Sequence, residues 1–219
     1  EVLDFLNNEN SSVATVDENG VITAKKNGIV WLKAKVGTSE DKIPVIVSLP
    51  IVEGLSPAFN VIRENKANYE LTKTSLTIDL QRGDLYQNDN TVNNLFLYTI
   101  PQTIDKNNFR TIVKVQNMPI RENGQWDTAS FILYNNDDNY ITIGKKSHFN
   151  GISSVSETNG TAVETGGNSE QNNVTTAYLG FSKNGTTVSL DFKIEGGSWQ
   201  HLRNIDGSML GTNFKIGFA

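Results

Sequence analysis

Short runs of alternating apolar and polar residues recur along the chain, and clusters of polar turn residues separate them. The clearest example is residues 126–146, in which two alternating runs flank the polar residues Asn135 to Asp138. In the first run Ala129, Phe131 and Leu133 fall on one face, and the second run alternates in the same way. This pattern indicates an antiparallel hairpin, because Asn and Asp bond nearby backbone and tolerate left-handed turns. We therefore predict two paired strands here, with a two-layer β-sandwich built around them.

The same alternation predicts strands throughout the chain. The predicted strands are residues 2–6, 12–16, 21–24, 29–36, 43–49, 59–63, 69–72, 75–80, 95–99, 109–117, 128–134, 140–146, 151–157, 177–183, 186–195, 199–202 and 214–218. About a dozen strands in the last ~160 residues favour a sandwich over an α/β fold. The polar segment 165–175 has no period, and we predict that it is a mobile surface loop.

A short linker is predicted between two domains. Pro50, Gly54 and Pro57 mark it, because Pro and Gly are frequent where regular structure is interrupted. We place the first domain at residues 1–49, the linker at 50–57 and the second domain at 58–219. A linker of this length leaves little freedom for tumbling, so we expect the two domains to touch.

The composition excludes several classes of protein. The chain has no cysteine, which excludes disulfides, thiolate metal sites and cysteine nucleophiles. Its net charge is −5 without any basic cluster, which argues against nucleic acid as a partner. No apolar run approaches membrane-spanning length, and the first residues lack a signal-peptide pattern. We therefore expect a mature, soluble piece of a protein, with no membrane span.

The first domain contains a motif with a known counterpart. Residues 12–16 read Ser-Val-Ala-Thr-Val, a turn with Gly20 follows, and residues 21–24 read Val-Ile-Thr-Ala before a second glycine, Gly28. This stretch resembles the core of a group 2 bacterial immunoglobulin-like domain. It departs from that family by lacking the opening strands, which would precede Glu1. The resemblance implies a partial immunoglobulin-like sandwich, of the kind that serves as a spacer or adhesion module in bacterial surface and secreted proteins.

Several motifs of the second domain resemble another family. They are Gly-Asp-Leu-Tyr at 83–86, the Asn-rich stretch 90–97, the hairpin 129–140, Tyr-Leu-Gly-Phe-Ser-Lys-Asn-Gly at 178–185, Gly-Gly-Ser-Trp at 196–199 and the closing run 214–219. Together they are similar to the concanavalin A-like, or laminin G-like, C-terminal module of family 43 glycoside hydrolases, over nearly all of residues 58–219. Ser130 and Phe131 stand where that family usually has Gly-Leu, and Gly196 stands where Asp is common.

The second resemblance implies an all-β, concanavalin A-like jelly-roll sandwich appended to a carbohydrate-active enzyme or a surface protein. In members of that family, the module borders a separate catalytic propeller or binds glycan. This sequence shows no propeller and has no length to hold one.

Candidate catalytic and metal-binding groups are few. Hydrolysis of a glycoside needs two carboxylates held about 5 to 9 Å apart, whereas Asp137 and Asp138 are adjacent in a predicted turn, and we interpret them as turn residues. Asp84 and Asp89, with the asparagines around them, are weak candidates for a calcium site, because carboxylates and amide oxygens are natural calcium ligands. The alternative is an Asn-rich loop without metal. Neither histidine lies near a sharp nucleophile turn, and we expect no Ser–His–Asp triad.

Aromatic residues are better candidates, because flat rings bind the C–H faces of sugars while polar side chains bond the hydroxyls. Trp126 lies just before a predicted strand, and Trp199 follows a Gly-Gly-Ser turn. The candidate carbohydrate-binding residues are Trp126, Tyr140, His148, Trp199 and Arg121. For both tryptophans, packing inside the sandwich is the alternative role. Trp31, in the middle of a strand of the first domain, is expected in the core.

The leading hypothesis is a non-catalytic, carbohydrate-binding accessory region of a secreted or cell-surface glycoside hydrolase from a Gram-positive bacterium. Its partners would be glycan or polysaccharide and a neighbouring domain of the same parent protein. A second hypothesis is a spacer or adhesin module that packs against that neighbour. A third is that the sandwich is itself a polysaccharide hydrolase or lyase.

Overall fold

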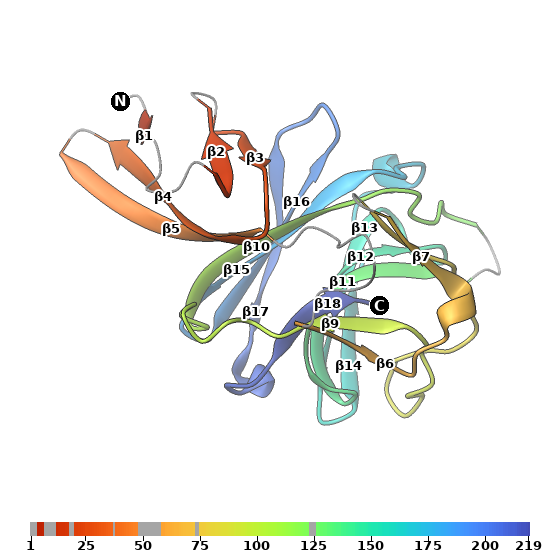
Figure 1. The fold of residues 1–219 in the computed structure, drawn as a ribbon. Coiled ribbons are helices and arrows are strands. Elements are labelled where there is room, and N and C mark those ends of the chain that lie inside the picture. Colours follow the sequence, from red (N-terminus) through yellow and green to blue (C-terminus); the bar gives the residue numbers. More distant parts are fainter. Residues whose placement is uncertain are drawn as a thin grey trace. The chain divides into compact units, whose positions relative to one another are not determined.

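The computed structural model describes residues 4–6, 12–17, 20–36, 38–47, 58–72, 75–122 and 126–219. The chain forms two compact units: unit 1 comprises Glu1–Ser56 with Leu71–Leu76, and unit 2 comprises Pro57–Glu70 with Thr77–Ala219. Among the described residues, the regular structure is antiparallel sheet with three single-turn 3-10 helices (Figure 1). The predicted all-β class is confirmed. No helix in the described part of the chain is long and apolar enough to cross a membrane.

Unit 1 contains a three-stranded sheet and a hairpin. The sheet has the order β1 (Asp4–Leu6), β4 (Gly28–Val36) and β5 (Ser39–Val47), and the hairpin joins β2 (Ala14–Val16) to β3 (Ile22–Ala24). Among the described residues of unit 1, the buried ones are Val13, Ala14, Val30, Leu32 and Val47.

Two features of unit 1 follow from its packing. At Gly28 the backbone has φ +153, and a Cβ there would lie 2.9 Å from Val13 Cγ2, so this position requires glycine. Trp31 was expected in the core, but it is 40% exposed. Because successive residues of a strand point to opposite faces, burial of Val30 and Leu32 turns Trp31 outward.

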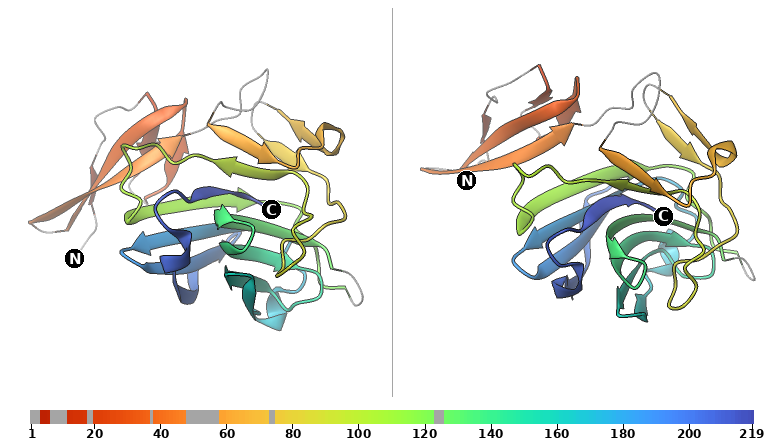
Figure 2. Two further views of the ribbon diagram at one scale, coloured as in Figure 1. Left: turned by 90° about the horizontal axis from the view of Figure 1, so that it is seen from below. Right: turned by 60° about the horizontal axis from the view of Figure 1, so that its bottom comes forward.

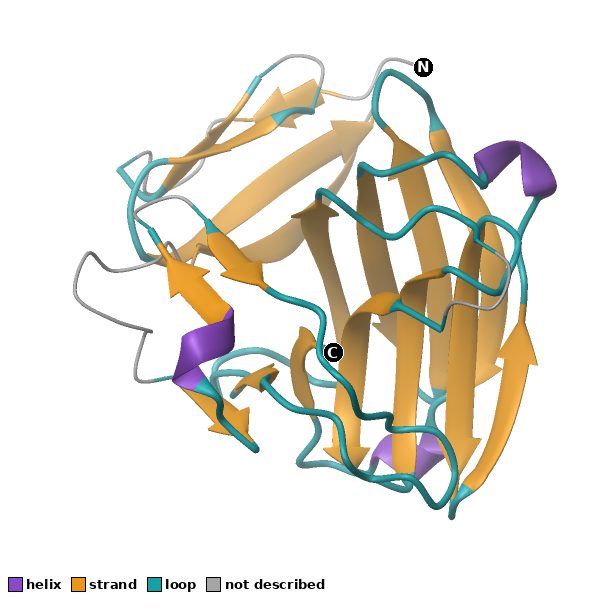
Figure 3. Cartoon of the chain, turned by 90° about the vertical axis from the view of Figure 1, so that its right-hand side faces the viewer, coloured by secondary structure: helices purple, strands orange, loops and turns teal. Residues whose placement is uncertain are grey.

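Unit 2 is a sandwich of two antiparallel sheets (Figures 2 and 3). The seven-stranded sheet has the order β14 (Thr161–Thr165), β13 (Ile152–Thr158), β12 (Asn139–Lys146), β11 (Thr128–Asn136), β18 (Lys215–Phe218), β9 (Leu95–Tyr98) and β6 (Phe59–Ile62). The four-stranded sheet has the order β10 (Asn108–Val115), β15 (Ala177–Asn184), β16 (Thr187–Ile194) and β17 (Trp199–Asp206). The remaining elements are the 3-10 helices η1 (Lys66–Asn68), η2 (Ser169–Gln171) and η3 (Ser208–Leu210). The strands β7 (Tyr69–Leu71) and β8 (Leu76–Ile78) pair with each other, and each has residues in both units.

The predicted hairpin of residues 126–146 is present as β11 and β12, and it lies at the centre of unit 2. Leu133 is paired with Ile141. On one face Phe131 packs against Phe181 of the other sheet, with ring centroids 5.0 Å apart. On the opposite face, Ile132, Tyr134 and other apolar residues form a second cluster: Leu85, Leu95, Leu97, Ile132, Tyr134, Tyr140 and Val155. The hairpin is therefore buried on both faces, and the sandwich has a third, thinner layer.

That third layer is the loop that contains the Gly-Asp-Leu-Tyr motif. At Gly83 the backbone has φ +133, and a Cβ would lie 2.5 Å from the carbonyl oxygen of Thr91, so the loop folds back tightly on itself. The backbone N–H groups of Thr91 and Val92 both donate to the Asp84 carbonyl at 2.9 Å. Leu85 then enters the apolar cluster over the sheet.

The acidic turn of the hairpin is an anchor for this loop and for β6. Arg63 donates to both oxygens of Asp137, at 2.9 and 3.1 Å, and the Tyr134 hydroxyl donates to Oδ1 at 2.9 Å. Desolvation raises the pKa of Asp137, but the hydrogen bonds from Arg63 and Tyr134 and the Arg63 charge outweigh it, and the net pKa is lowered. The interpretation of Asp137 as a structural turn residue agrees with these contacts.

The polar segment 165–175 was predicted to be a mobile loop, but a buried lysine holds it in place. Lys145 is 0% exposed, and its ammonium donates to the carbonyl oxygens of Gln171, Asn172 and Val174, the first at 3.1 Å and the last at 3.0 Å. Gln171 is buried and its Oε1 accepts a bond from the Ile152 N–H at 3.0 Å. A segment without hydrophobic period is thus ordered by hydrogen bonds to its backbone.

Candidate functional site

Two of the predicted sugar-binding residues, Trp126 and His148, lie against each other at one end of the seven-stranded sheet. Trp126 precedes β11 and is 74% exposed, and His148 lies in the turn after β12. Their ring centroids are 4.3 Å apart with an interplanar angle of 37°. His148 also contacts the Phe149 ring edge-on, at 5.4 Å. The result is an exposed indole supported from one side by a second ring.

The strand register brings these residues together. Thr128, at the start of β11, pairs with Lys146, at the end of β12, so the residues before and after the hairpin lie side by side. The Ser147 N–H donates to the Asp127 carbonyl at 2.8 Å and continues this pairing beyond the strands. Phe149 lies over Gly166, where a Cβ would come within 2.4 Å of its ring. The turn that carries His148 is therefore held on both sides.

Charged groups border the two rings. Lys146 Nζ and Glu164 Oε1 form an ion pair at 2.7 Å, and the same carboxylate oxygen lies 3.8 Å from His148 Nε2. Lys146 Nζ also lies 5.4 Å from the centroid of the Tyr86 ring, which comes from the covering loop. We call Trp126, His148, Lys146, Glu164 and Tyr86 the Trp126–His148 surface. It combines an exposed apolar ring with a donor and an acceptor suited to hydroxyl groups.

The His148 imidazole is shifted toward its neutral form. Desolvation is the largest cause of its lowered pKa; the Glu164 carboxylate opposes this shift and the Lys146 charge adds to it. His148 Nδ1 is buried and has no hydrogen-bond partner among the described residues. A neutral imidazole can both stack on the indole and either donate or accept a hydrogen bond.

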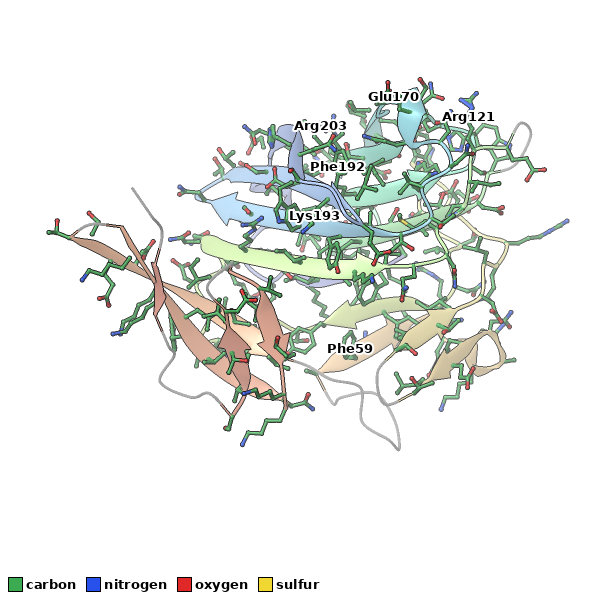
Figure 4. All side chains as sticks on the ribbon, turned by 90° about the horizontal axis from the view of Figure 1, so that it is seen from above. Phe59, Arg121, Glu170, Phe192, Lys193 and Arg203 are labelled. Carbon is green, nitrogen blue, oxygen red and sulfur yellow. The ribbon has the colours of Figure 1, made fainter. Side chains whose placement is uncertain are left out.

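Arg121 is exposed beside the turn that carries His148. Its Nη1 donates to Asn150 Oδ1 at 2.6 Å, and its backbone N–H donates to the Asn172 carbonyl at 3.1 Å. The next residue, Glu122, donates its N–H to the Ser147 carbonyl at 2.9 Å. Arg121 and Glu170 appear at the same end of unit 2 in Figure 4. Arg121 is therefore a neighbour of the Trp126–His148 surface, through the turn of residues 147–150.

Tyr140 is not available at the surface, which corrects its selection from the sequence. It is 3% exposed, its hydroxyl donates to the Leu85 carbonyl at 2.7 Å, and it lies 3.0 Å from Glu157 Oε2. Burial of the ring and use of its hydroxyl inside the third layer remove it from the accessible candidates. The alternation of residues along β12 does not reveal this burial, because both faces of the strand are covered.

Trp199 lies on a different surface, the outer face of the four-stranded sheet. It is 39% exposed, and the guanidinium carbon of Arg110 lies 5.0 Å from its ring centroid. Its neighbour His201 lies 2.9 Å, Nδ1 to Oδ1, from Asp191. The structure therefore divides the predicted aromatic candidates between two sheets.

The weak calcium candidates are used by the covering loop. Asp84 Oδ1 accepts a bond from the Leu85 N–H at 2.7 Å, and Asp89 Oδ1 accepts one from the Thr91 hydroxyl. Because the Asp84 carboxylate accepts a bond from the Leu85 N–H, it fits the alternative interpretation, a structural Asn-rich loop. Within the described ranges, no group of three or more His, Cys, Asp or Glu side chains gathers.

Comparison with known proteins relates the fold to glycoside hydrolases. The GH43 protein BlXynB of Bacillus licheniformis has a TM-score of 0.61 at 13% identity, over 94% of this chain and 48% of its own. A GH43_12 protein retrieved from a capybara gut metagenome has a TM-score of 0.57 at 13% identity, over 98% of this chain and 42% of its own. A functionally unknown protein from Saccharomyces cerevisiae has a TM-score of 0.54 at 12% identity, over 74% of this chain and 85% of its own.

These likenesses show the fold alone, because the identities are low. The chain spans about half the length of the GH43 structures that it matches. No family model and no curated protein matches the sequence. The class that the structure defines is thus a β-sandwich whose fold matches part of GH43 glycoside hydrolases.

Sequence reasoning missed part of the Trp126–His148 surface. Glu164 lies on β14, a strand that was not predicted, and Lys146 and Tyr86 were not selected. The alternation in residues 161–165 is a usable signal for β14, but no local pattern specifies that this strand pairs with β13. That pairing, Val155 with Glu164, places the carboxylate beside Lys146.

Proposed function

We propose that unit 2 is a non-catalytic carbohydrate-binding module that keeps a glycoside hydrolase close to its glycan, and that sugar binds at the Trp126–His148 surface. The parent protein would be a secreted or cell-surface enzyme, with a catalytic domain in addition to this chain. The likeness to about half of GH43 structures supports an accessory role.

The observation that carries this proposal is the Trp126 indole, which is 74% exposed while its other side rests on His148. Large aromatic side chains contribute much of the energy of interfaces because they bury large areas at low entropic cost. An indole that is already supported loses little freedom on binding. The C–H face of a sugar ring can therefore stack on the exposed face of the Trp126 indole.

Polar groups around the indole suit the hydroxyls of such a sugar. Lys146 and Glu164 supply a donor and an acceptor, and the N–H groups of Arg121 supply further donors at the neighbouring turn. Binding sites for small polar ligands commonly combine an apolar surface with a few placed polar groups. Glu164 Oε1 is buried and engaged with Lys146 at 2.7 Å, so the acceptor that remains for a hydroxyl is Oε2.

Glycan binding by the whole 219-residue chain tests this function. A glycan array, followed by affinity gels containing xylan, arabinan, galactan or mucin glycan, identifies the ligand. Trp126→Ala should reduce affinity for it at least about tenfold, which is about 1.4 kcal/mol. Trp31→Ala is the matched control, because Trp31 is also an exposed tryptophan but lies in unit 1.

Two results would contradict the proposal. The first is no retention on any pentose, hexose or mucin glycan, which would favour a spacer that packs against a neighbouring domain. The second is release of sugar from one of these polysaccharides by the purified chain, which would favour the third hypothesis, a hydrolase or lyase.

A further inference from the structure

The outer face of the four-stranded sheet carries aromatic and cationic side chains that the proposed site does not use. Along its strands, residues of one parity are buried against the seven-stranded sheet, namely Leu179, Phe181, Val188, Leu190 and Phe192. Side chains of the other parity point away from it: Arg110, Ile112, Lys114, Tyr178, Lys193 and Trp199. Phe192 and Lys193, consecutive on β16, leave the strand on opposite sides (Figure 4). We call these six residues the outer-sheet surface.

One cation lies over the Trp199 ring of this surface, and two lie over the Tyr178 ring. The Arg110 guanidinium carbon lies 5.0 Å from the centroid of the Trp199 ring, although the two residues come from the two edge strands of the sheet. Lys114 and Lys193 lie 5.6 and 5.7 Å from the Tyr178 ring centroid. Their side chains therefore lie across the sheet face and hold the rings in place.

The carboxylates of this face already have partners, whereas two of its cations have no carboxylate beside them among the described residues. Asp206 accepts bonds from the N–H and the hydroxyl of Ser208. Glu195 forms an ion pair with Lys114 at 2.7 Å, and Asp191 lies 2.9 Å from His201 Nδ1. Within the described part of the chain, Arg110 and Lys193 have no carboxylate within 4.0 Å. Two cations without a carboxylate partner, each beside a flat ring, favour an anionic ligand.

The chemistry of Arg110 favours a carboxylate as that anion. A guanidinium that stacks on an indole keeps the N–H donors of its planar edge, and these match the two oxygens of a carboxylate. Trp199 and Tyr178 lie two strands apart, through the pairs Trp199–Lys193 and Lys193–Tyr178, which is about 10 Å. The surface thus offers two flat rings with a cation beside each of them.

We infer that the outer-sheet surface binds a polysaccharide built from uronic acids, with sugar rings on Trp199 and Tyr178 and carboxylates on Arg110 and Lys193. This second binding surface goes beyond the proposed function, because it lies on the other sheet and shares no residue with the Trp126–His148 surface. It would let the chain bind acidic polysaccharide whether or not the Trp126–His148 surface binds a neutral one.

Affinity electrophoresis and calorimetry of the full chain test this inference. The ligands are polygalacturonate, alginate and glucuronoxylan, each measured at about 20 mM and about 200 mM salt. Retention on at least one of them should weaken at the higher salt, because the contacts are charged. Methyl esterification of that polymer should abolish the retention, since it removes the carboxylate charge and preserves the sugar backbone. Retention on none of the three polymers would overturn the inference.

Matched variants locate the binding. Arg110→Gln and Trp199→Ala should each reduce affinity for the acidic polymer at least tenfold, and Arg110→Lys should reduce it less than Arg110→Gln. Trp126→Ala should leave it unchanged, so failure of this inference and failure of the proposed function are distinguishable. Thermal unfolding of each variant confirms that the fold is intact, which is expected because Arg110 is exposed.

Three further outcomes would overturn the inference. One is equal binding of the free acid and its methyl ester, and another is binding that Arg110→Gln does not change. The third is equal binding of dextran sulfate or a single-stranded oligonucleotide, which would indicate a general polyanion surface.

Discussion

The rings of Trp126 and His148 lie 4.3 Å apart, although the whole β11–β12 hairpin separates them in the sequence. The contact exists because the two strands are paired from Thr128 with Lys146 at their open end. The hairpin that forms the centre of the core thus also brings the candidate binding residues together. Its acidic tip, at the opposite end, has the different role of anchoring β6 and the covering loop.

The Asp137 anchor predicts a loss of stability in acid. Its pKa is lowered in the folded state, so its contribution is present above the ordinary value of 3.8 and is lost as pH falls through the folded pKa. Asp137→Asn should lower the free energy of unfolding at pH 7 by about 1.5–3 kcal/mol, the range for a hydrogen bond to a charged group. It should also flatten the acid limb of stability. Urea unfolding between pH 3 and 7 measures both effects.

Asp138→Asn is the control for that experiment, because Asp138 is exposed and its Oδ1 accepts one long bond, 3.3 Å, from Asn90. Equal effects of the two substitutions would contradict the assigned role of Asp137.

Lys145 predicts that a single side chain orders the segment 165–175. Lys145→Met keeps the length of the side chain but leaves three carbonyl groups without their donor. The free energy of unfolding should fall by about 1–3 kcal/mol, the cost of buried polar groups left unpaired. Hydrogen exchange should accelerate at residues 171–174 more than in β15. Lys66→Met, at an exposed lysine, should change neither quantity, and unchanged exchange in Lys145→Met would contradict the proposal.

The burial of Glu157 predicts that it affects stability with a pH dependence opposite in sign to that of Asp137. Desolvation is the main cause of its raised pKa, partly offset by hydrogen bonds from Gln87 and Tyr140. Its favourable contribution is therefore complete below the ordinary value of 4.5 and is lost as pH rises through the folded pKa. Glu157→Gln should reduce the fall in stability between pH 4.5 and 7, measured by thermal or urea unfolding. A pH profile identical to that of the unchanged protein would contradict this account.

His148 predicts that glycan binding weakens in acid. Because its pKa is lowered, the imidazole is neutral at pH 7 and gains its proton below the ordinary value of 6.5. A charged imidazole carries an N–H at Nδ1, which is buried and has no hydrogen-bond partner among the described residues, so protonation disturbs the ring that supports Trp126. Affinity for the glycan should fall as pH decreases from 7 to 5, and His148→Gln should remove this dependence. A pH-dependent affinity that persists in His148→Gln would assign the titration to another group.

Much of the fold follows from the local pattern of the sequence. The hairpin of residues 126–146 was predicted with nearly the observed bounds because its alternation and turn chemistry agree. The predictions were wrong where tertiary contacts, and not the local pattern, decide the structure. The segment 165–175 has no apolar period, yet the Lys145 ammonium orders it through backbone carbonyls, which no pattern of side chains encodes.

The candidate surfaces were predictable only in part. Trp126 and His148 were selected as single residues, and their contact depends on strand pairing. Tyr140 was a candidate for a concave binding face, but the covering loop occupies the face of β12 on which it lies. Arg110 and Tyr178 were missed because the outer-sheet surface is assembled from strands far apart in the sequence.

Isothermal titration calorimetry of Trp126→Ala tests the central claim most directly. The titrant is the glycan that the array identifies for the unchanged chain, and Trp31→Ala is measured alongside. The account predicts at least about a tenfold loss of affinity for Trp126→Ala, with no change in thermal stability and no change for Trp31→Ala. Equal affinity of Trp126→Ala and the unchanged chain would contradict the assignment of sugar binding to the Trp126–His148 surface.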